Sequence, residues 1–322
     1  MHTIVSRRML LALAASVVSS SAWAYPDKQI QVVVPWPAGG VVDTVARMAS
    51  ARLASALGQA VVVVNRPGAG GTIGSDLVAK SSANGYTFLV TSSGMSMNHA
   101  LRKDTLPFDM TRDLAPVGVI SSATQVIVVN ATAPVTDIKS LVQAAKSSPG
   151  KLNYASAGNG SPAHMGSELL KSATGTFITH IPFQGAPAAL TSTVSGDTLF
   201  FMAPIPTALP LIKAGRLRVV ATTGPTRSAS LPDAPTVAES GLPGFEATQW
   251  IGMFAPRQTP QDMVTRVANE LVRITKDPAF RSELAARGLE IQEADAKAFG
   301  QMVSSDLSRW EELVRNTGIK VD

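Results

Sequence analysis

Three glycine- and serine-bearing loops hold the residues of this chain that could bind an anion. They read PWPAGG after Val34, TSSGM after Val90 and ASAGNGSP after Tyr154, and each follows the C-terminal end of a candidate parallel strand. The first and third lead into helical patterns, whose free N–H groups and dipole favour a negative group. Glycines let the backbone approach a ligand closely, and serine hydroxyls can donate to it. The chemistry that these loops indicate is anion capture.

Each piece of this pattern also has a plainer reading. Gly39 and Gly40 can form a tight turn, Asp43 can neutralise the start of its own helix, and Trp36 can be a packing residue. His164 stands near a helix start and can be a surface residue as well as a donor to a ligand. Only the arrival of all three loops at the ends of parallel strands, where open α/β sheets bind their ligands, favours the functional reading.

Catalytic motifs are poorly represented. NRPGAGGTIGS resembles a dinucleotide fingerprint, but Ile73 occupies the place of the last glycine. The sequence has no P-loop and no G-x-S-x-G nucleophile elbow, and His99, His164 and His180 are too far apart for a helix-borne zinc pair. A serine–histidine–aspartate site assembled from scattered residues stays open. We therefore expect a binding protein with no catalytic residue, no metal and no cofactor.

The elements around these loops predict an α/β fold. Ile30–Val34 and Ala60–Val64 read as buried strands, and YTFLVTSSG, beginning at Tyr86, holds a third. Helical patterns separate the three, and the first helix stops at Gly58, a helix C-cap signal. All-apolar strands that alternate with helices imply a parallel sheet with helices on both faces.

A second strand–helix system follows, so the mature chain of about 300 residues is expected to form two domains. DLAPVGVISSATQVIVVNAT offers two strands in succession, and the chain returns through a Pro- and Gly-rich stretch to a strand at Trp250–Ala255. We predict that domain 1 spans 25–124 plus 250–322 and that domain 2 spans 125–249. Two crossover segments indicate a hinged clamshell, with the last helix packed back on domain 1.

The N-terminal 24 residues predict export. MHTIVSRRMLLALAASVVSSSAWA has a basic start, an apolar run at Met9–Val18 that is too short to span a bilayer, and a small-residue cleavage site at Ala24. The paired Arg7 and Arg8 also resemble a twin-arginine signal, although Sec export is the plainer reading. The mature protein is therefore expected in the periplasm.

The composition argues against several classes. The 322 residues include no cysteine, which excludes disulfides and thiolate metal sites. The net charge of +5 comes from scattered lysines and arginines without a run of five like charges, and aromatic residues make up only 5% of the chain. Neither a nucleic-acid surface nor a sugar-stacking groove is expected.

The chain resembles the Bug-type extracytoplasmic solute receptors, the substrate-binding proteins of tripartite tricarboxylate transporters. It does so in YPDKQIQVVVPWPAGGVVDTVARMASARLASALGQAVVVVNRPGAGGTIGSDLVAKSSANGYTFLV, PGKLNYASAGNGSPAHMGSELLK, HIPFQGAPAAL, ALPLIKAGRLRVVA and LPDAPTVAESGLPGFEATQWIGMFAP, in that order along the mature chain. The resemblance implies a type II periplasmic-binding-protein fold, a small carboxylate ligand and membrane transporter subunits as partners. We expect the receptor itself to be a monomer.

The resemblance also implies which residues meet the ligand. A carboxylate is expected against Trp36–Gly40 and Ala157–Ser161, held by backbone amides, hydroxyls and ordered waters and not by an arginine. Thr91–Gly94 match a loop that lines the first domain, and Gln184–Ala186 match a further pocket segment. The candidate ligand-binding residues are Trp36, Pro37, Ala38, Gly39, Gly40, Asp43, Thr91, Ser92, Ser93, Ala157, Gly158, Asn159, Ser161, His164, Gln184, Gly185 and Ala203.

One segment departs from the family pattern. Relatives read Gly-Gly-Gln-Val-Asp followed by a polar pair, whereas this chain reads SGDTLFFMAPIP, with Leu199 at the first acidic place and Ala203-Pro204 at the polar pair. In relatives a carboxylate near the second place can meet the ammonium of an amino-acid ligand, so its absence disfavours that class. An apolar wall of Met202, Ala203 and Pro204 suits an aromatic or aliphatic acid, unless the family tolerates variation here without a change of ligand.

Three functions stay open at this level. A periplasmic receptor that feeds a tripartite tricarboxylate-type transporter agrees best with the loops and the resemblance. A ligand-sensing receptor for a two-component sensor kinase would have the same sequence features. A secreted α/β hydrolase is the catalytic alternative, and turnover assays would reveal it.

Overall fold

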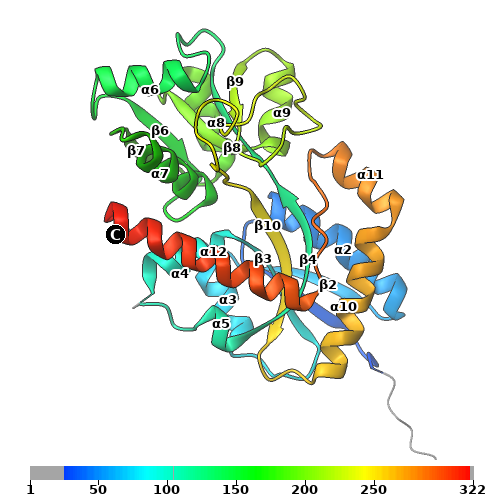
Figure 1. The fold of residues 1–322 in the computed structure, drawn as a ribbon. Helices are drawn as coiled ribbons and strands as arrows, with labels where there is room; N and C mark the ends of the chain where they lie inside the picture. The colour runs from blue at the N-terminus through cyan, green and yellow to red at the C-terminus, as the bar shows by residue number, and fades with distance from the viewer. Residues whose placement is uncertain (1–24, 104, 320–322) are drawn as a thin grey trace, which may run out of the picture.

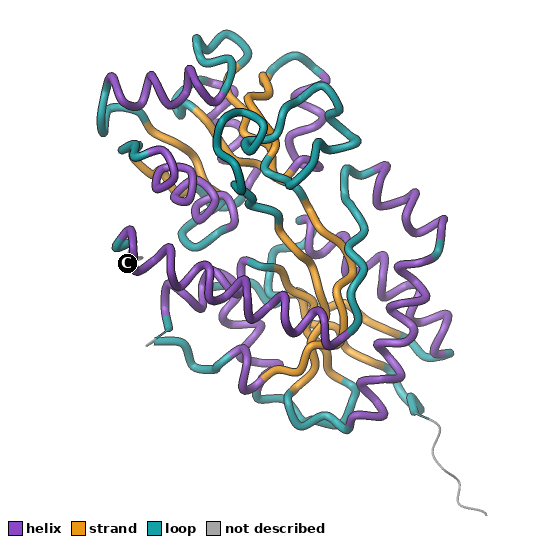
Figure 2. The backbone as a smooth tube through the Cα atoms, in the orientation of Figure 1, coloured by secondary structure: helices purple, strands orange, loops and turns teal. Residues whose placement is uncertain are grey.

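The structure is a computed structural model that describes residues 25–103 and 105–319, so the predicted signal segment lies outside the described residues. Two five-stranded sheets organise the chain, in the strand orders β2-β1-β3-β10-β4 and β7-β6-β8-β5-β9. Figures 1 and 2 show them as two lobes, joined where strands run from one sheet toward the other. We name the lobe around the first sheet the first lobe and the other the second lobe.

The first sheet is mixed. Its strands are β1 (Ile30–Val34), β2 (Val61–Asn65), β3 (Thr87–Ser92), β4 (Leu114–Ala123) and β10 (Gln249–Pro256). The predicted parallel pairing is confirmed for β1 with β2 and with β3. β10, however, runs antiparallel to both β3 and β4. The apolar pattern could not reveal this, because a strand buried on both faces reads as a continuous apolar run in either direction.

Helices cover both faces of the first sheet, as predicted. Val32 of β1 belongs to the apolar core formed with α2 and α10, and Val33 belongs to the core on the opposite face, formed with α3, α4 and α12. The helices of this lobe are α2 (Val41–Leu57), η2 (Ala69–Gly71), α3 (Thr72–Ala79), α4 (Gly94–Arg102), α5 (Met110–Asp113), α10 (Gln261–Lys276), α11 (Pro278–Ala286) and α12 (Ala296–Thr317).

The second lobe repeats this plan. β6 pairs in parallel with β7 and β8, while β5 is antiparallel to β8 and β9. Met202 lies in the core shared with α6 and α7, and its neighbour Ala203 lies in the core shared with α8 and α9. The elements are β5 (Gln125–Asn130), α6 (Ile138–Ser147), β6 (Asn153–Ser156), α7 (Pro162–Thr174), β7 (Thr179–Pro182), α8 (Ala186–Ser195), β8 (Phe200–Pro204), α9 (Ile205–Lys213) and β9 (Leu217–Thr222).

Two crossings join the lobes. Thr124 alone separates β4 from β5, and the segment 223–248 returns from β9 to β10. The predicted domain limit at 124/125 lies at the first crossing, and the one at 249/250 falls after the first residue of β10, at the end of the second crossing. Both limits stay a prediction. No helix of the described part of the chain is both long and apolar enough to cross a membrane.

The last helix, α12, touches both lobes. It begins at the cap Asp295, ends at Gly318 with φ of 66°, and packs Phe299 on the first sheet as predicted. Its second half runs beneath α7 in Figure 1, where Trp310 shares a buried apolar cluster with Met165 of the second lobe. The helix thus contacts the second lobe as well, which the sequence did not predict.

Candidate functional site

Two sheet edges bring the predicted loops together. β1, β2 and β3 are parallel, as are β6, β7 and β8, so in each sheet three carboxyl ends lie at one edge. We name the segments at these ends loop one (35–40), the glycine loop (68–71), loop two (91–94) and loop three (156–161). The two edges face each other, because Gly70 of the first lobe and Gly160 of the second lobe both pack against the side-chain amide of Asn98. A Cβ atom added to Gly70 would lie 2.2 Å from Asn98 Nδ2, and one added to Gly160 would lie 2.8 Å from Asn98 Oδ1.

Helix starts lie at these edges, and several of them lack a capping side chain. The N-cap residues of α2, α3, α4, α8 and α9 make no side-chain hydrogen bond to their helices, although the Gly94 N–H of α4 donates to Ser92 Oγ at 3.4 Å. An uncapped start offers free N–H groups and the positive end of the helix dipole to an anion. These helix starts can therefore bind a negative group without an arginine.

Aspartates cap several helices elsewhere in the chain. The carboxylates of Asp109, Asp137, Asp277 and Asp295 accept the first N–H groups of α5, α6, α11 and α12. A carboxylate satisfies the donors of a helix start as a ligand carboxylate would. The sheet-edge starts of α2, α3, α4, α8 and α9 have no such carboxylate, and neither does the start of α10 elsewhere in the described chain. At the sheet edges an anion could take the place of the capping carboxylate.

Asp43 shapes loop one from within. It is 3% exposed and accepts hydrogen bonds from the Gly39 N–H at 2.8 Å, from Asn65 Nδ2 at 2.9 Å and from Arg47 Nε at 3.0 Å. Burial acts to raise the pKa of Asp43, but the bonds from Arg47, Gly39 and Asn65 outweigh it and hold the pKa below its usual value. The ionised carboxylate therefore uses one of the N–H groups of loop one, and the geometry agrees with the plainer reading of this residue.

Trp36 packs between two glycines. Its ring occupies the space that side chains at positions 71 and 94 would need, because Cβ atoms added to Gly71 and Gly94 would lie 3.2 and 3.1 Å from the ring. The Trp36 Nε1–H donates to Thr91 Oγ1 at 3.3 Å. Loop one, the glycine loop and loop two are thus joined through one indole. The ring is partly exposed, so packing and a ligand contact can coexist.

Two stacked histidines support loop three. Gly160 N–H donates to His164 Nδ1 at 3.1 Å, and Ser156 Oγ lies 2.6 Å from His180 Nε2. Because His164 Nδ1 accepts this bond, its ring proton is on Nε2. Burial, and next the charge of Lys171, lowers the pKa of His164 to about 4, and burial together with His164 lowers that of His180 to about 3. His164 is a buried, neutral support of the loop and not a surface residue.

The remaining candidates occupy two kinds of place. Pro37, Ala38, Gly39, Asn159 and Gln184 are exposed, whereas Thr91, Ser92 and Ser93 are fully buried. The Ser93 hydroxyl has no hydrogen-bond partner among the described residues. Ala157 and Gly158 are partly exposed on loop three, and Gly185 begins α8 with φ of 95°. Which of these residues touch a ligand stays a prediction.

The departing segment is mostly core. Met202 and Ala203 have no exposed surface, since they face opposite cores of the second lobe. Pro204 is the partly exposed member of the predicted apolar wall, and it pairs with Gln125 next to the crossing. Any effect of this segment on ligand choice therefore depends first on Pro204.

Sequence reasoning missed the glycine loop and Asn98. The glycine loop has the strand–glycine–helix pattern of loop one in VVVVNRPGAGGTIGS, so the same rule would have found it. Asn98 carries no such signal, because its neighbours Gly70 and Gly160 are distant in the sequence and only the fold brings them together.

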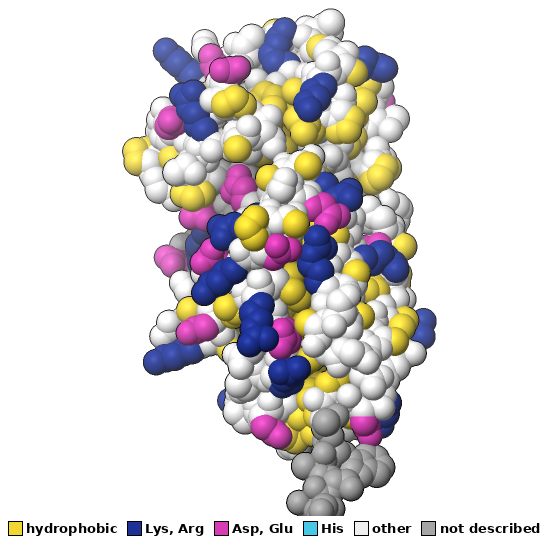
Figure 3. All heavy atoms as spheres, turned by 90° about the vertical axis from the view of Figure 1, so that its right-hand side faces the viewer, with side chains coloured by type: hydrophobic (Ala, Val, Ile, Leu, Met, Phe, Trp, Pro, Cys, Tyr) yellow, Lys and Arg dark blue, Asp and Glu magenta, His cyan; other side chains and the backbone are white. Residues whose placement is uncertain are grey.

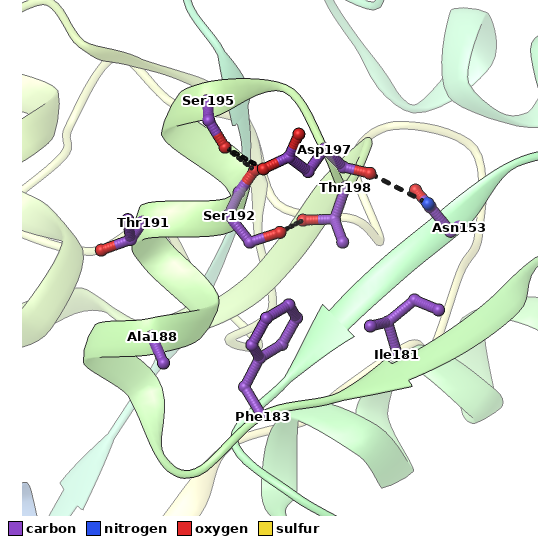
Figure 4. Close-up of a pocket in the computed structure, with 9 residues that line it drawn as sticks. All are labelled: Asn153, Ile181, Phe183, Ala188, Thr191, Ser192, Ser195, Asp197 and Thr198. Carbon is purple, nitrogen blue, oxygen red and sulfur yellow. Dashed lines mark hydrogen bonds between the residues drawn. The ribbon is translucent and has the colours of Figure 1, made fainter.

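A separate pocket of about 730 Å³ lies in the second lobe between α8 and β7. Figure 4 shows its polar groups bonded to one another: Ser195 donates to Asp197 at 2.6 Å, Ser192 pairs with Thr198 at 3.2 Å, and Asn153 donates to the Asp197 carbonyl at 3.0 Å. No lysine or arginine lines it. With Asp197 at its rim, it is a poor site for a carboxylate.

The surface charges are mixed where Figure 3 shows them. On this face the lysine and arginine side chains are interspersed with those of aspartate and glutamate. Ion pairs of the described chain, such as Arg281 with Glu293 at 2.7 Å and Arg52 with Glu283 at 2.9 Å, likewise bring opposite charges together. Opposite charges at this spacing largely cancel beyond a Debye length. This face therefore presents no large field of one sign.

Comparisons with known proteins place this chain in a family. The family model described as "Tripartite tricarboxylate transporter family receptor" matches residues 45–319. The UPF0065 protein of the tcbD-tcbE intergenic region of Pseudomonas sp. (strain P51) is 35% identical over 96% of this chain and 93% of its own. A protein of R. palustris solved with adipate superposes with a TM-score of 0.85 at 32% identity, covering 92% of this chain and 99% of that one. MatC from Rhodopseudomonas palustris, solved with bound malate, gives 0.82 at 30% identity, covering 90% and 100%.

Proposed function

Because the chain belongs to the tripartite tricarboxylate transporter receptor family, we propose that it captures a small carboxylate between its two lobes and presents it to a membrane transporter. The mature protein, 25–322, would do so in the periplasm, where the predicted signal segment directs it. Its task is binding and release, without a catalytic step.

The observation that carries this proposal is the set of helix starts without a capping side chain at the facing sheet edges, together with the glycines of loops one and three. The start of α7, which follows loop three, is capped by Ser161. Each contact between an anion and a helix start contributes only about 0.3–1 kcal/mol when exposed and about 2 kcal/mol when partly buried. Micromolar affinity corresponds to about −8 kcal/mol. Several helix starts must therefore act together, and closure of the lobes must exclude water from the carboxylate.

We propose an aliphatic or aromatic acid as the ligand class. The relatives solved with adipate and malate support a carboxylate of this size. Pro204 and the buried Ala203 stand where relatives carry a polar pair, so a ligand ammonium would find no carboxylate there. An amino-acid ligand would leave that ammonium desolvated and unpaired, which is costly.

A thermal-shift screen of residues 25–322 tests the proposal. The protein is unfolded and refolded first to remove any retained ligand, then heated with adipate, malate, benzoate, glutamate or glucose. A ligand that binds only the native state adds about 2.7 kcal/mol of stability at a hundredfold excess over its dissociation constant. We expect a shift with at least one of the first three acids. A shift with glucose alone, or with no carboxylate, would contradict the proposal.

A further inference from the structure

The two lobes meet at Asn98 within the candidate site. Asn98 lies on α4 of the first lobe and is 3% exposed. Gly160 of loop three lies so close to its amide that a Cβ on Gly160 would be 2.8 Å from Oδ1 and 3.1 Å from Cγ and Nδ2. Heavy-atom contacts shorter than 3.0 Å require something to shift, so only a glycine fits at this position.

The Asn98 amide cannot easily move away. Nδ2 donates to the Gly70 carbonyl at 2.7 Å and faces the Gly94 carbonyl at 3.4 Å, which fixes the orientation of the amide. A Cβ on Gly70 would lie 2.2 Å from the same Nδ2, so the Gly70 backbone also packs directly on the amide. Oδ1 is buried and has no hydrogen-bond partner among the described residues. The Asn98 amide is thus held in one orientation and packs closely against both Gly70 and Gly160.

The contact continues along α4 as an apolar interface. Met97, the neighbour of Asn98, shares a buried cluster with Met165 of α7 and with Trp310 and Leu313 of α12. α7 is the helix that loop three leads into, and Ser161, the cap of this helix, directly follows Gly160. The position of Gly160 on Asn98 therefore sets where loop three and the start of α7 stand relative to the first lobe.

We propose that the contact between Gly160 and Asn98 positions loop three for ligand binding: the loop reaches its ligand-holding place only when no side chain at residue 160 strikes the Asn98 amide. The inference rests on the proposed function, since it concerns the same interlobe site. Asn98 acts through Gly160 and need not touch the ligand. A side chain at residue 160 holds the lobes apart, and the helix starts of the two lobes then cannot act on one carboxylate together.

The substitution Gly160→Ala tests this, with Gly175→Ala, at the end of α7, as its matched control. Both glycines have positive φ, 72° and 60° respectively, so both variants strain the backbone. A Cβ on Gly175 meets nothing within 4 Å. We expect Gly160→Ala to weaken binding of adipate, malate or benzoate, measured by calorimetry, by about tenfold or more relative to Gly175→Ala.

A rescue variant separates positioning from damage to the loop. Asn98→Ala removes the amide that a new Cβ would strike, so Asn98→Ala combined with Gly160→Ala should bind more tightly than Gly160→Ala alone. Small-angle scattering gives the second readout: the wild type should contract when ligand is added, and Gly160→Ala should contract less. Equal dissociation constants for the wild type and Gly160→Ala, or a double variant no better than Gly160→Ala, would overturn the inference. A wild type that binds none of these acids would overturn the proposed function itself.

Discussion

The imidazole rings of His164 and His180 stack with their centroids 4.0 Å apart directly behind loop three. A charge on one ring would lie against the other, and burial disfavours a charge on either. The pKa of His164 accordingly falls to about 4 and that of His180 to about 3, so both rings are neutral at neutral pH. Loop three therefore rests on a pair of uncharged rings.

Acid should weaken the fold through this pair. Both pKa values are lower in the folded protein than the unfolded value of about 6.5, so their contribution to stability is present above pH 6.5 and is lost as the pH falls toward 4 and 3. The slope per histidine is at most about 1.4 kcal/mol per pH unit. Urea unfolding at a series of pH values between 4 and 8 measures how the free energy of unfolding depends on pH. His180→Gln should flatten the profile, and an unchanged profile would contradict this account.

Asp306 should act with the opposite sign. The indoles of Trp250 and Trp310 donate to its carboxylate at 3.0 and 2.8 Å. Burial raises the pKa of Asp306 to about 6, although Arg309 and these bonds oppose the rise. The pKa of Asp306 is thus higher in the folded protein than its unfolded value of about 3.9, so folding favours the protonated acid. The stability that Asp306 contributes is therefore fully present below pH 3.9 and is lost as the pH rises through 6.

Asp306→Asn isolates that contribution, because the amide resembles the protonated acid. We expect the stability of the variant relative to the wild type to improve as the pH rises from 4 to 7, followed by tryptophan fluorescence during urea unfolding. A difference that stays constant over this range would show that Asp306 does not titrate there.

Gly40→Val should weaken carboxylate binding and leave the fold intact. Gly40 has φ of −74° and ψ of 170°, which any residue can adopt, and a Cβ would meet only the Pro37 carbonyl at 3.4 Å. Valine would therefore cover the start of α2 without backbone strain. We expect a loss of about tenfold in affinity, equal to 1.4 kcal/mol, with little change in melting temperature. Gly39 is less suitable, because its φ of 79° strains any substitution. An unchanged dissociation constant would argue against loop one.

Asp43→Ala and Asp137→Ala form a matched pair. Asp43 binds Gly39 of loop one together with Asn65 of β2 and Arg47 of α2, while Asp137 caps α6. Loss of either carboxylate should cost about 1–3 kcal/mol of stability, because backbone donors lose their partner. Only Asp43→Ala should also weaken ligand binding, since only it reshapes the loop. Equal effects on affinity would mean that loop one does not hold the ligand.

Pro204→Asp should change the preferred ligand class. It restores an acidic side chain near the place where relatives carry a polar pair, beside the crossing at Gln125. A carboxylate there repels a ligand carboxylate and attracts an ammonium. We expect weaker binding of adipate and benzoate and a gain for glutamate, with Pro204→Ala as the neutral control. The same change for all three ligands would assign Pro204 to packing alone.

Local signals in the sequence predicted most elements. Ser161, Pro162 and Gly175 mark the start and end of α7, and the structure confirms each in its predicted role. The strand Ile30–Val34 is confirmed at both ends, and α12 ends at Gly318 as predicted. These succeed because caps and buried strands are decided by a few neighbouring residues.

Contacts between distant residues could not be predicted in this way. The apolar wall assigned to Met202, Ala203 and Pro204 is mainly core, because alternate residues of β8 face opposite sides of the sheet. The stack of His164 on His180 and the seat of Gly160 on Asn98 join segments that only the fold brings together. A single sequence indicates which residues are compatible with a loop, but it does not show which distant residues pack against that loop in the folded protein.

The inner place of β10 affects the order in which the protein can fold. This strand lies between β3 and β4 but is the last strand to be synthesised. Until Pro256 has emerged, β4 has no partner in the first sheet, while every strand of the second lobe is already available. Such non-local pairing slows folding, because a long loop must close before the contacts form. The first lobe, and with it loop one, is thus completed last.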